Sequence, residues 1–206
     1  MRVDHLVYAT PDLGLGIDTV ERLLGVRAIP GGQHPGAGTH NALVALGPGT
    51  YLEIVGPDPA QPEPEQPRWF CIDEIDAPQL VTWAARVDGI EQVRGEAQRL
   101  GISLGDIVAG NRRRSDGVLL TWRYTNPRTI VADGILPFLI DWGATPHPSD
   151  SAARGATLIH LRAEHPQREA IRDTARQLGL CLQVDRGSQP ALIATIECPN
   201  GEVELH

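Results

Sequence analysis

The 206-residue sequence contains no lysine, so all 18 of its basic residues are arginine. This absence excludes a Schiff-base lysine, a lysine general base and the lysine of a phosphate-binding P-loop. No apolar run approaches the roughly 18 residues that a membrane-spanning helix needs. The stretch MRVDHLVYAT places Asp4 and His5 where a signal peptide needs its apolar core. The sequence therefore predicts a cytoplasmic protein.

Cysteine and positive charge are scarce as well. Three cysteines, Cys71, Cys181 and Cys198, are widely spaced and odd in number, which argues against a disulfide framework. The net charge of −8 disfavours nucleic acid and anionic membranes as partners. Hydrophobic residues make up 41% of the chain and charged residues 21%, as in an ordinary soluble globular protein.

What the sequence does contain is a pattern that occurs three times: a strand, a helix and three more strands. In its first copy, the strand VDHLVYAT precedes an amphipathic helix from Asp12 to Leu24, with Gly25 as the expected C-terminal cap. Two strands, NALVALG and TYLEIVG, follow a glycine-rich stretch. All three predicted helices end in Leu-Gly followed by an aliphatic residue. Repetition of this length indicates duplicated modules.

The module boundaries follow from composition. We expect modules at residues 1–56, 79–142 and 156–206, joined by linkers at 57–78 and 143–155 that are rich in proline or in small polar residues. Asp88 is the expected N-cap of the second helix, and Pro166 is expected in the first turn of the third.

The repeat and two motifs, DHLVYATPDL and GGQHPGAGTHNALVALG with YLEIVG, resemble the vicinal oxygen chelate superfamily and, more narrowly, its glyoxalase-like branch. The segment LPFLIDWG followed by His147-Pro148 strengthens the narrower match. The resemblance covers nearly the whole chain. It implies an α+β fold of the glyoxalase/bleomycin resistance/dihydroxybiphenyl dioxygenase type, in which repeated βαβββ modules form curved mixed sheets around a cleft. It also implies metal ligands on the first and fourth strands of each module.

Two side chains of the first module fit that expectation. Strand alternation places His5 on one face with Val3, Val7 and Ala9, and Glu53 on one face with its neighbours two residues away. The resemblance puts both on ligand positions, and imidazole with carboxylate suits Zn²⁺, Fe²⁺, Mn²⁺, Ni²⁺ or Co²⁺. The alternative is a hydrogen-bonded histidine and a surface glutamate.

The other modules leave the ligand set open. His160 and Glu204 occupy the corresponding strands of the third module. They would complete a two-His, two-carboxylate set like that of glyoxalase I if modules one and three met within a chain or across a homodimer. The second module departs from this pattern, because its two strands offer Val81, Trp83, Ile140 and Asp141. If modules one and two pair, the cleft holds at most His5, Glu53 and Asp141.

The glycine-rich stretch from Gly31 to Gly38 lacks a P-loop lysine and leads into a strand, so we do not expect a phosphate cradle. It is better interpreted as a pliable loop at the mouth of the cleft. There His34 and His40, with Glu53, would act as acid/base groups, or the two histidines would be extra ligands near His5 or ordinary loop histidines.

Substrate contacts are expected from the second module. Arg123, in TWRYT, could hold a substrate carboxylate if it faces inward, in which case Trp122 and Tyr124 face the other way. Trp83 and Phe138 would either wall the cleft or pack in the core, and Asp141 would lie beside the substrate.

Two further motifs carry no expected function. The run Arg112-Arg113-Arg114 is interpreted as a solvated turn, and His147 as a structural residue.

Two functions from different classes follow. The first is a divalent-metal-dependent lyase, isomerase or dioxygenase, in which the ion binds two oxygens of a small oxygenated organic substrate and His or Glu moves a proton. The second is a metal-free protein that binds or sequesters a small molecule. A purely structural dimerisation module is a third reading, which the polar residues at ligand positions disfavour.

Overall fold

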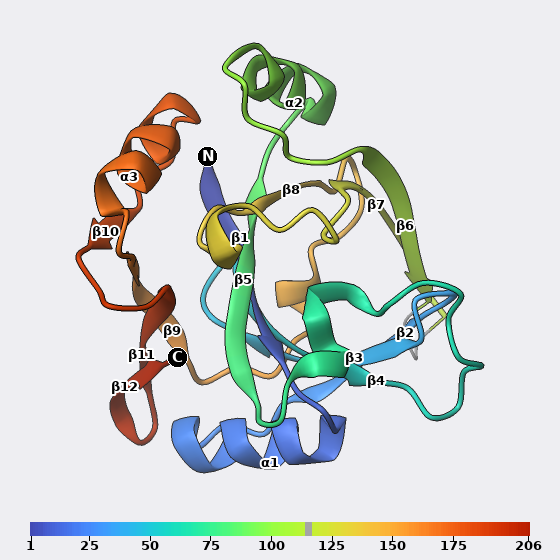
Figure 1. Cartoon of the computed structure of the whole chain (residues 1–206). Coiled ribbons are helices and arrows are strands. Elements are labelled where there is room, and N and C mark those ends of the chain that lie inside the picture. Colours follow the sequence, from blue (N-terminus) through green and yellow to red (C-terminus); the bar gives the residue numbers. More distant parts are fainter. Residues whose placement is uncertain (114–116) are drawn as a thin grey trace.

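Figure 1 shows the computed structural model, which describes residues 1–113 and 117–206. The first module consists of β1 (Arg2–Ala9), α1 (Leu13–Leu24), β2 (Ile29–His34), β3 (Thr39–Ala45) and β4 (Tyr51–Pro57). Helix α1 begins where Asp12 Oδ1 accepts a hydrogen bond from the amide of Leu15, at 2.8 Å, and ends at Gly25 with a φ of 70°. The expected C-terminal cap at Gly25 is present, and Asp12, expected within the helix, is its N-cap.

The second module has the same order: β5 (Gln79–Arg86), α2 (Ile90–Arg99), β6 (Ile107–Arg113), β7 (Leu119–Thr125) and β8 (Phe138–Asp141). Short 3₁₀ turns precede it, interrupt it and follow it: η1 (Trp69–Glu74), η2 (Ala132–Gly134) and η3 (Pro148–Asp150). The N-cap of α2 is Gly89, with a φ of 79°, and not the predicted Asp88. Gly89 fits because this backbone conformation disfavours a side chain.

The third module repeats the order once more: β9 (Thr157–Glu164), α3 (Arg168–Gln177), β10 (Gln183–Asp185), β11 (Ala191–Cys198) and β12 (Gly201–Leu205). The helix starts two residues after Pro166, and the ring of His165 accepts a hydrogen bond from the amide of Gln167 at 2.9 Å. The predicted α+β fold of three βαβββ modules is confirmed.

Modules one and two share one eight-stranded mixed sheet, in the order β2-β3-β4-β1-β5-β8-β7-β6. Strands β1 and β5 join the modules in antiparallel register, with His5 opposite Ala84. The sheet curls strongly enough for its edge strands β2 and β6 to touch. At this seam a Cβ on Gly32 would lie 2.9 Å from Cδ of Arg112, so glycine lets the two edges meet.

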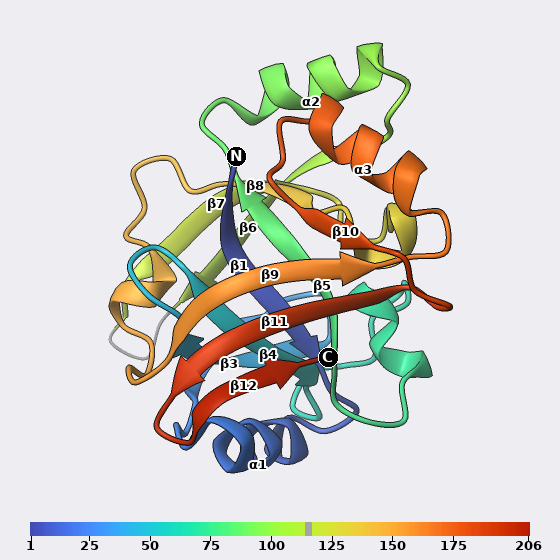
Figure 2. The same ribbon diagram turned by 90° about the vertical axis from the view of Figure 1, so that its left-hand side faces the viewer.

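The third module forms a separate four-stranded sheet, in the order β10-β9-β11-β12. Figure 2 shows this sheet lying across β1 and β5. Its side chains Leu161, Ala194 and Ile196 belong to the same apolar cluster as Leu6 and Trp83 of the large sheet. The third module thus covers the outer face of the eight-stranded sheet and does not extend it.

The concave face of the large sheet carries a second apolar cluster, which includes Val7, Ala84, Phe138, Ile140 and Trp142. Two packed layers on opposite faces of one sheet explain why β1 is buried from Asp4 to Ala9 and β5 from Trp83 to Ala85. None of the helices in the described part of the chain combines the length and apolarity required to cross a membrane.

Candidate active site

A small cavity lies inside the curved sheet, and we call it the inner cavity. Its volume is about 40 Å³. Five polar or charged side chains line it: His5, His34, Asn41, Glu53 and Arg112. The rest of the lining consists of eight aromatic or aliphatic residues and one proline, among them Tyr51, Trp69, Trp122, Tyr124 and Trp142. The predicted juxtaposition of His5 and Glu53 is present, since both side chains are buried in this one space.

An irregularity in β1 brings Asp4 to the same site as His5. Neighbouring residues of a regular strand point to opposite faces. Here the register with β5 shifts between Val3 and His5, so Asp4 is an extra residue without a partner of its own. Such a bulge turns a side chain away from its expected face. The Asp4 carboxylate consequently contacts the imidazole of His5, with Oδ1 2.7 Å from Nδ1.

Asp4 is fully buried and collects three hydrogen bonds. Besides His5, it accepts from Trp142 Nε1 at 3.0 Å and contacts His147 Nε2 at 3.1 Å, both through Oδ2. Burial alone would raise its pKa, but the hydrogen bonds and positive charge of His147 and His5 outweigh burial and lower the pKa to about 2. Asp4 is therefore a carboxylate that fixes His5 with its Nδ1 occupied and its Nε2 facing Glu53.

Glu53 lies between two imidazoles. Its Oε2 is 3.6 Å from His5 Nε2, and its Oε1 is 3.6 Å from His34 Nε2. Asn41 donates a hydrogen bond to Oε1 of Glu53. The other amide atom of Asn41, Oδ1, is buried with no hydrogen-bond partner among the described residues. It lies against Gly31 of β2, where an added Cβ would come within 2.1 Å of it.

His34 is held as a neutral ring. Its Nδ1 lies 2.9 Å from the hydroxyl of Thr39, and its Nε2 lies 3.3 Å from Nδ2 of Asn41. Burial lowers its pKa to about 4, against the opposing attraction of Glu53. Arg112 is one of the positive charges that lower it further. At neutral pH, His34 thus offers a hydrogen-bonded imidazole and no charge.

Tyr51 and Arg112, which lies at the seam between β2 and β6, also line the polar side of the inner cavity. The Tyr51 ring stacks on His5 with centroids 4.7 Å apart, and burial raises the pKa of its hydroxyl well above the usual value. Arg112 is buried against Gly31 and Gly32. The expectation of a solvated turn is wrong for Arg112, because the curled sheet brings β6 over β2; Arg114 lies outside the described residues. The expected pliable loop is likewise wrong for Gly31 to His34, which form part of β2.

The second module presents apolar residues at the matching positions. His5 pairs with Tyr51 across β1 and β4, and Ala84 pairs with Phe138 across β5 and β8. Two residues further along β4 lies Glu53, and two residues further along β8 lies Ile140. By this register Ala84 is the counterpart of His5, and Ile140 is the counterpart of Glu53. The second half of the interior offers no ligand at either position.

The donor set therefore does not fit the four-ligand metal centre that the resemblance implied. His160 and Glu204 are exposed on the separate third sheet, where they flank Thr195 of β11. Within one chain they do not join His5 and Glu53. In residues 1–113 and 117–206, no three His, Cys, Asp or Glu side chains are grouped so that they could hold one metal ion.

Several other predicted site residues lie outside the inner cavity. His40 lies on the opposite face of β3, where its Nδ1 is 3.9 Å from Oδ1 of Asp58. Trp83 packs in the outer core, where its Nε1 donates to the carbonyl of Ile135 at 2.8 Å. It therefore does not wall the cavity. Phe138 does line the cavity, with its ring 5.5 Å from that of His5.

The inward direction expected for Arg123 is wrong. Trp122 and Tyr124 line the inner cavity, so strand alternation turns Arg123 outward. There it pairs with Glu91 and with Asp141, whose Oδ2 is 3.2 Å away.

Asp141 also lies outside the cavity lining, and it supports the start of α2. Its carboxylate accepts from the amides of Gly143, at 2.9 Å, and Gly89, at 3.2 Å. Burial raises its pKa, but these backbone bonds and others, with Arg123, lower it overall. Asp141 thus links the end of β8 to the start of α2.

Sequence reasoning missed three polar members of the site: Asp4, Asn41 and Arg112. His147, interpreted from the sequence as structural, contacts Asp4 and supports the site. Asn41 could have been found, because it alternates with Leu43 on a strand that shares a module with His5 and Glu53. The bulge at Asp4 and the seam at Arg112 depend on pairing between distant strands, which no local pattern reports.

Comparison with known proteins agrees with this fold. A family model described as a glyoxalase-like domain matches residues 3–179. No curated protein matches the sequence. Among solved structures, a hypothetical protein from Staphylococcus aureus superposes with a TM-score of 0.63 at 14% identity, over 98% of this chain and 83% of that one. That likeness shows a shared fold that includes the third module.

Two further solved structures resemble the chain more distantly. Methylmalonyl-CoA epimerase from Mycobacterium tuberculosis has a TM-score of 0.44 at 18% identity, over 68% of this chain and 87% of that one. A hypothetical protein from Bacillus halodurans has a TM-score of 0.46 at 16% identity, over 70% of this chain and 96% of that one.

Proposed function

Because the chain belongs to the glyoxalase-like domain family, we propose that it is an isomerase or lyase that moves a proton on a small oxygenated organic molecule, with His5 as the base. The single observation that carries the proposal is the buried Asp4–His5 pair, 2.7 Å apart, with Nε2 of His5 directed at the inner cavity. A carboxylate on Nδ1 fixes the imidazole with its proton on that nitrogen and leaves Nε2 as the acceptor.

The neighbouring charges suit this step. When Nε2 removes a proton from a carbon next to a carbonyl, the C–H electron pair passes into an enolate, and His5 becomes an imidazolium. That cation would lie between the carboxylates of Asp4 and Glu53, which stabilise it. The buried guanidinium of Arg112 supplies positive charge on the same cavity wall for an anionic oxygen. Return of the proton to another position gives an isomer, and loss of a neighbouring group gives a lyase product.

The test is exchange of the carbon-bound protons of α-ketobutyrate in deuterated water, followed by NMR. We expect the protein to accelerate the exchange and His5→Gln to reduce the acceleration about 100-fold or more, as for loss of a general base. His40→Gln is the matched control, because His40 lies outside the cavity lining. Equal rates for His5→Gln and the unmodified chain would contradict the role of His5.

A second candidate is a binding protein without turnover. Ile140 and the three lining tryptophans favour it, since they form a wall suited to holding a flat or apolar group. Quenching of tryptophan fluorescence by a ligand that undergoes no proton exchange would support this reading over catalysis.

A further inference from the structure

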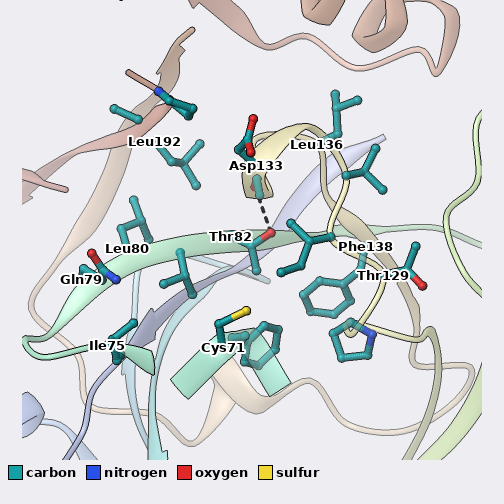
Figure 3. A pocket seen from close by; sticks show the side chains of 18 residues that line it. Cys71, Ile75, Gln79, Leu80, Thr82, Thr129, Asp133, Leu136, Phe138 and Leu192 are labelled. Atoms are coloured by element: carbon teal, nitrogen blue, oxygen red, sulfur yellow. Dashed lines mark hydrogen bonds between the residues drawn. The ribbon is translucent and has the colours of Figure 1, made fainter. Parts of the chain in front are cut away.

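A larger cavity lies beside the inner one, and we call it the outer cavity (Figure 3). It is bounded by η1, by the start of β5, by residues 127–136 and by the start of β11 in the third module. Apolar side chains dominate its lining, among them Ile75, Val81, Ile130, Leu136 and Leu192. The hydroxyl of Thr82 is already used, since it donates to the carbonyl of Gly134 at 3.0 Å.

The two cavities differ greatly in size. The inner cavity, of about 40 Å³, has room for a few water-sized groups, given that one water needs roughly 10–15 Å³ by this measure. The outer cavity measures about 370 Å³, within the range of about 300–1,000 Å³ that small-molecule sites occupy. The inner cavity can therefore hold only the reacting end of a substrate, and the outer cavity has room for the rest.

Only a thin wall separates them. Phe70, Pro127 and Phe138 line both cavities. The rings of Phe70 and Phe138 are 5.9 Å apart, and Phe138 also stands edge-on to His5. Displacement of these two rings would join the outer cavity to the imidazole.

Backbone strain gathers around the outer cavity. Among the described residues, four that are not glycine have positive φ: Phe70 at 61°, Cys71 at 53°, Ala132 at 51° and Asp133 at 54°. Three of them line the outer cavity and the fourth is adjacent. Such conformations are strained and collect at ligand clamps and switch regions. Strained backbone thus borders the outer cavity on two sides, and at Phe70 it forms part of the wall between the cavities.

We infer that the substrate is an elongated amphiphile, whose oxygenated head enters the inner cavity and whose apolar tail lies in the outer cavity. This inference rests on the proposed function, which supplies the head-group chemistry. The tail carries no charge, because Asp133, the one carboxylate among the described lining residues, is 63% exposed and pairs with His165 at 3.0 Å. The third module then has a function of its own: Pro190 to Leu192 close the tail compartment.

The experiment is a calorimetric titration with straight-chain α-keto acids from pyruvate to α-ketododecanoate. Each added methylene group should tighten binding roughly three- to fourfold until the outer cavity is full. Cys71 allows the outer cavity to be blocked in the folded protein, since its thiol lines that cavity and is exposed. In a Cys181→Ser/Cys198→Ser background, the benzyl adduct that benzyl methanethiosulfonate forms on Cys71 should abolish the gain in affinity with chain length. It should leave pyruvate binding unchanged. Reduction of the adduct should restore the gain.

The matched control places the same reagent on exposed Cys181 in a Cys71→Ser/Cys198→Ser background, where the gain should persist. Two results overturn the inference: pyruvate binding without any gain from longer chains, or an undiminished gain in the Cys71 adduct. Absence of binding across the whole series overturns it as well. The proposed function fails separately if the long-chain acids bind as expected and the Cys71 adduct abolishes the gain in affinity, but none of the acids exchanges its carbon-bound protons in a His5-dependent way.

Discussion

The two halves of the barrel interior are built on the same βαβββ order but carry opposite chemistry. The first-module half contributes Asp4, His5, His34, Asn41 and Glu53. The second-module half carries apolar side chains at the equivalent places, with Ala84 opposite His5 and Ile140 in the position of Glu53. Among the described residues, its one charged contribution to the cavity lining is Arg112 of β6.

This asymmetry explains how one duplicated fold can hold a reactive group and the wall beside it. The polar half is stabilised by hydrogen bonds that fix two imidazoles and a carboxylate, as burial of such groups requires. The apolar half needs no such support and is free to shape the space. One variant described next would remove this asymmetry by adding donors to the apolar half, and the others measure how much the polar half contributes to the free energy of unfolding.

Restoring the donors in the apolar half should have the largest effect. The double variant Ala84→His/Ile140→Glu would add an imidazole and a carboxylate facing His5 and Glu53, which completes a four-ligand set. We expect a gain of stoichiometric Co²⁺ binding, at least about tenfold tighter than in the unmodified chain, read from cobalt absorption spectra. Ala84→His alone is the control, and circular dichroism checks that the double variant folds. A folded double variant that binds no more cobalt than the control would show that our register assignment is wrong.

Removing the central carboxylate of the polar half should cost stability. Asp4→Ala leaves three buried partners, His5, His147 and Trp142, without their acceptor. We expect the free energy of unfolding in urea to fall by about 3–5 kcal/mol, as for a broken buried charge network. Asp18→Ala, which removes an exposed carboxylate, should change it by less than about 1 kcal/mol. Similar losses for the two variants would contradict a special role for Asp4.

The polar half should also make stability depend on pH through His34. Its folded pKa is about 4, against a reference value of 6.5. Between these values the unfolded chain binds a proton that the folded chain does not, so stability falls as pH falls through that window, by up to about 3 kcal/mol. Urea unfolding across the window measures this loss, and His34→Gln should remove most of it. A loss of the same size in His34→Gln would assign the pH dependence to other groups.

The sequence predicted the elements well because their signals are local. The amphipathic helix predicted from Asp12 to Leu24, its Gly25 cap and the repeated closing motif are readable within a few residues. Strand alternation, together with the family resemblance, likewise predicted that His5 and Glu53 share one interior. It failed one residue earlier, at Asp4, because a bulge breaks the period of two, and the bulge is defined only by the partner strand β5.

The sequence by itself determined the three modules and the residue types that could perform chemistry, since periodicity, capping and composition act over short stretches of chain. Only the tertiary structure decided that modules one and two share a sheet, that Trp122 and Tyr124 face inward while Arg123 faces out, and that His160 and Glu204 lie on a separate sheet. These outcomes depend on pairing and packing between segments far apart in sequence, where the free energy of burying whole faces selects the arrangement.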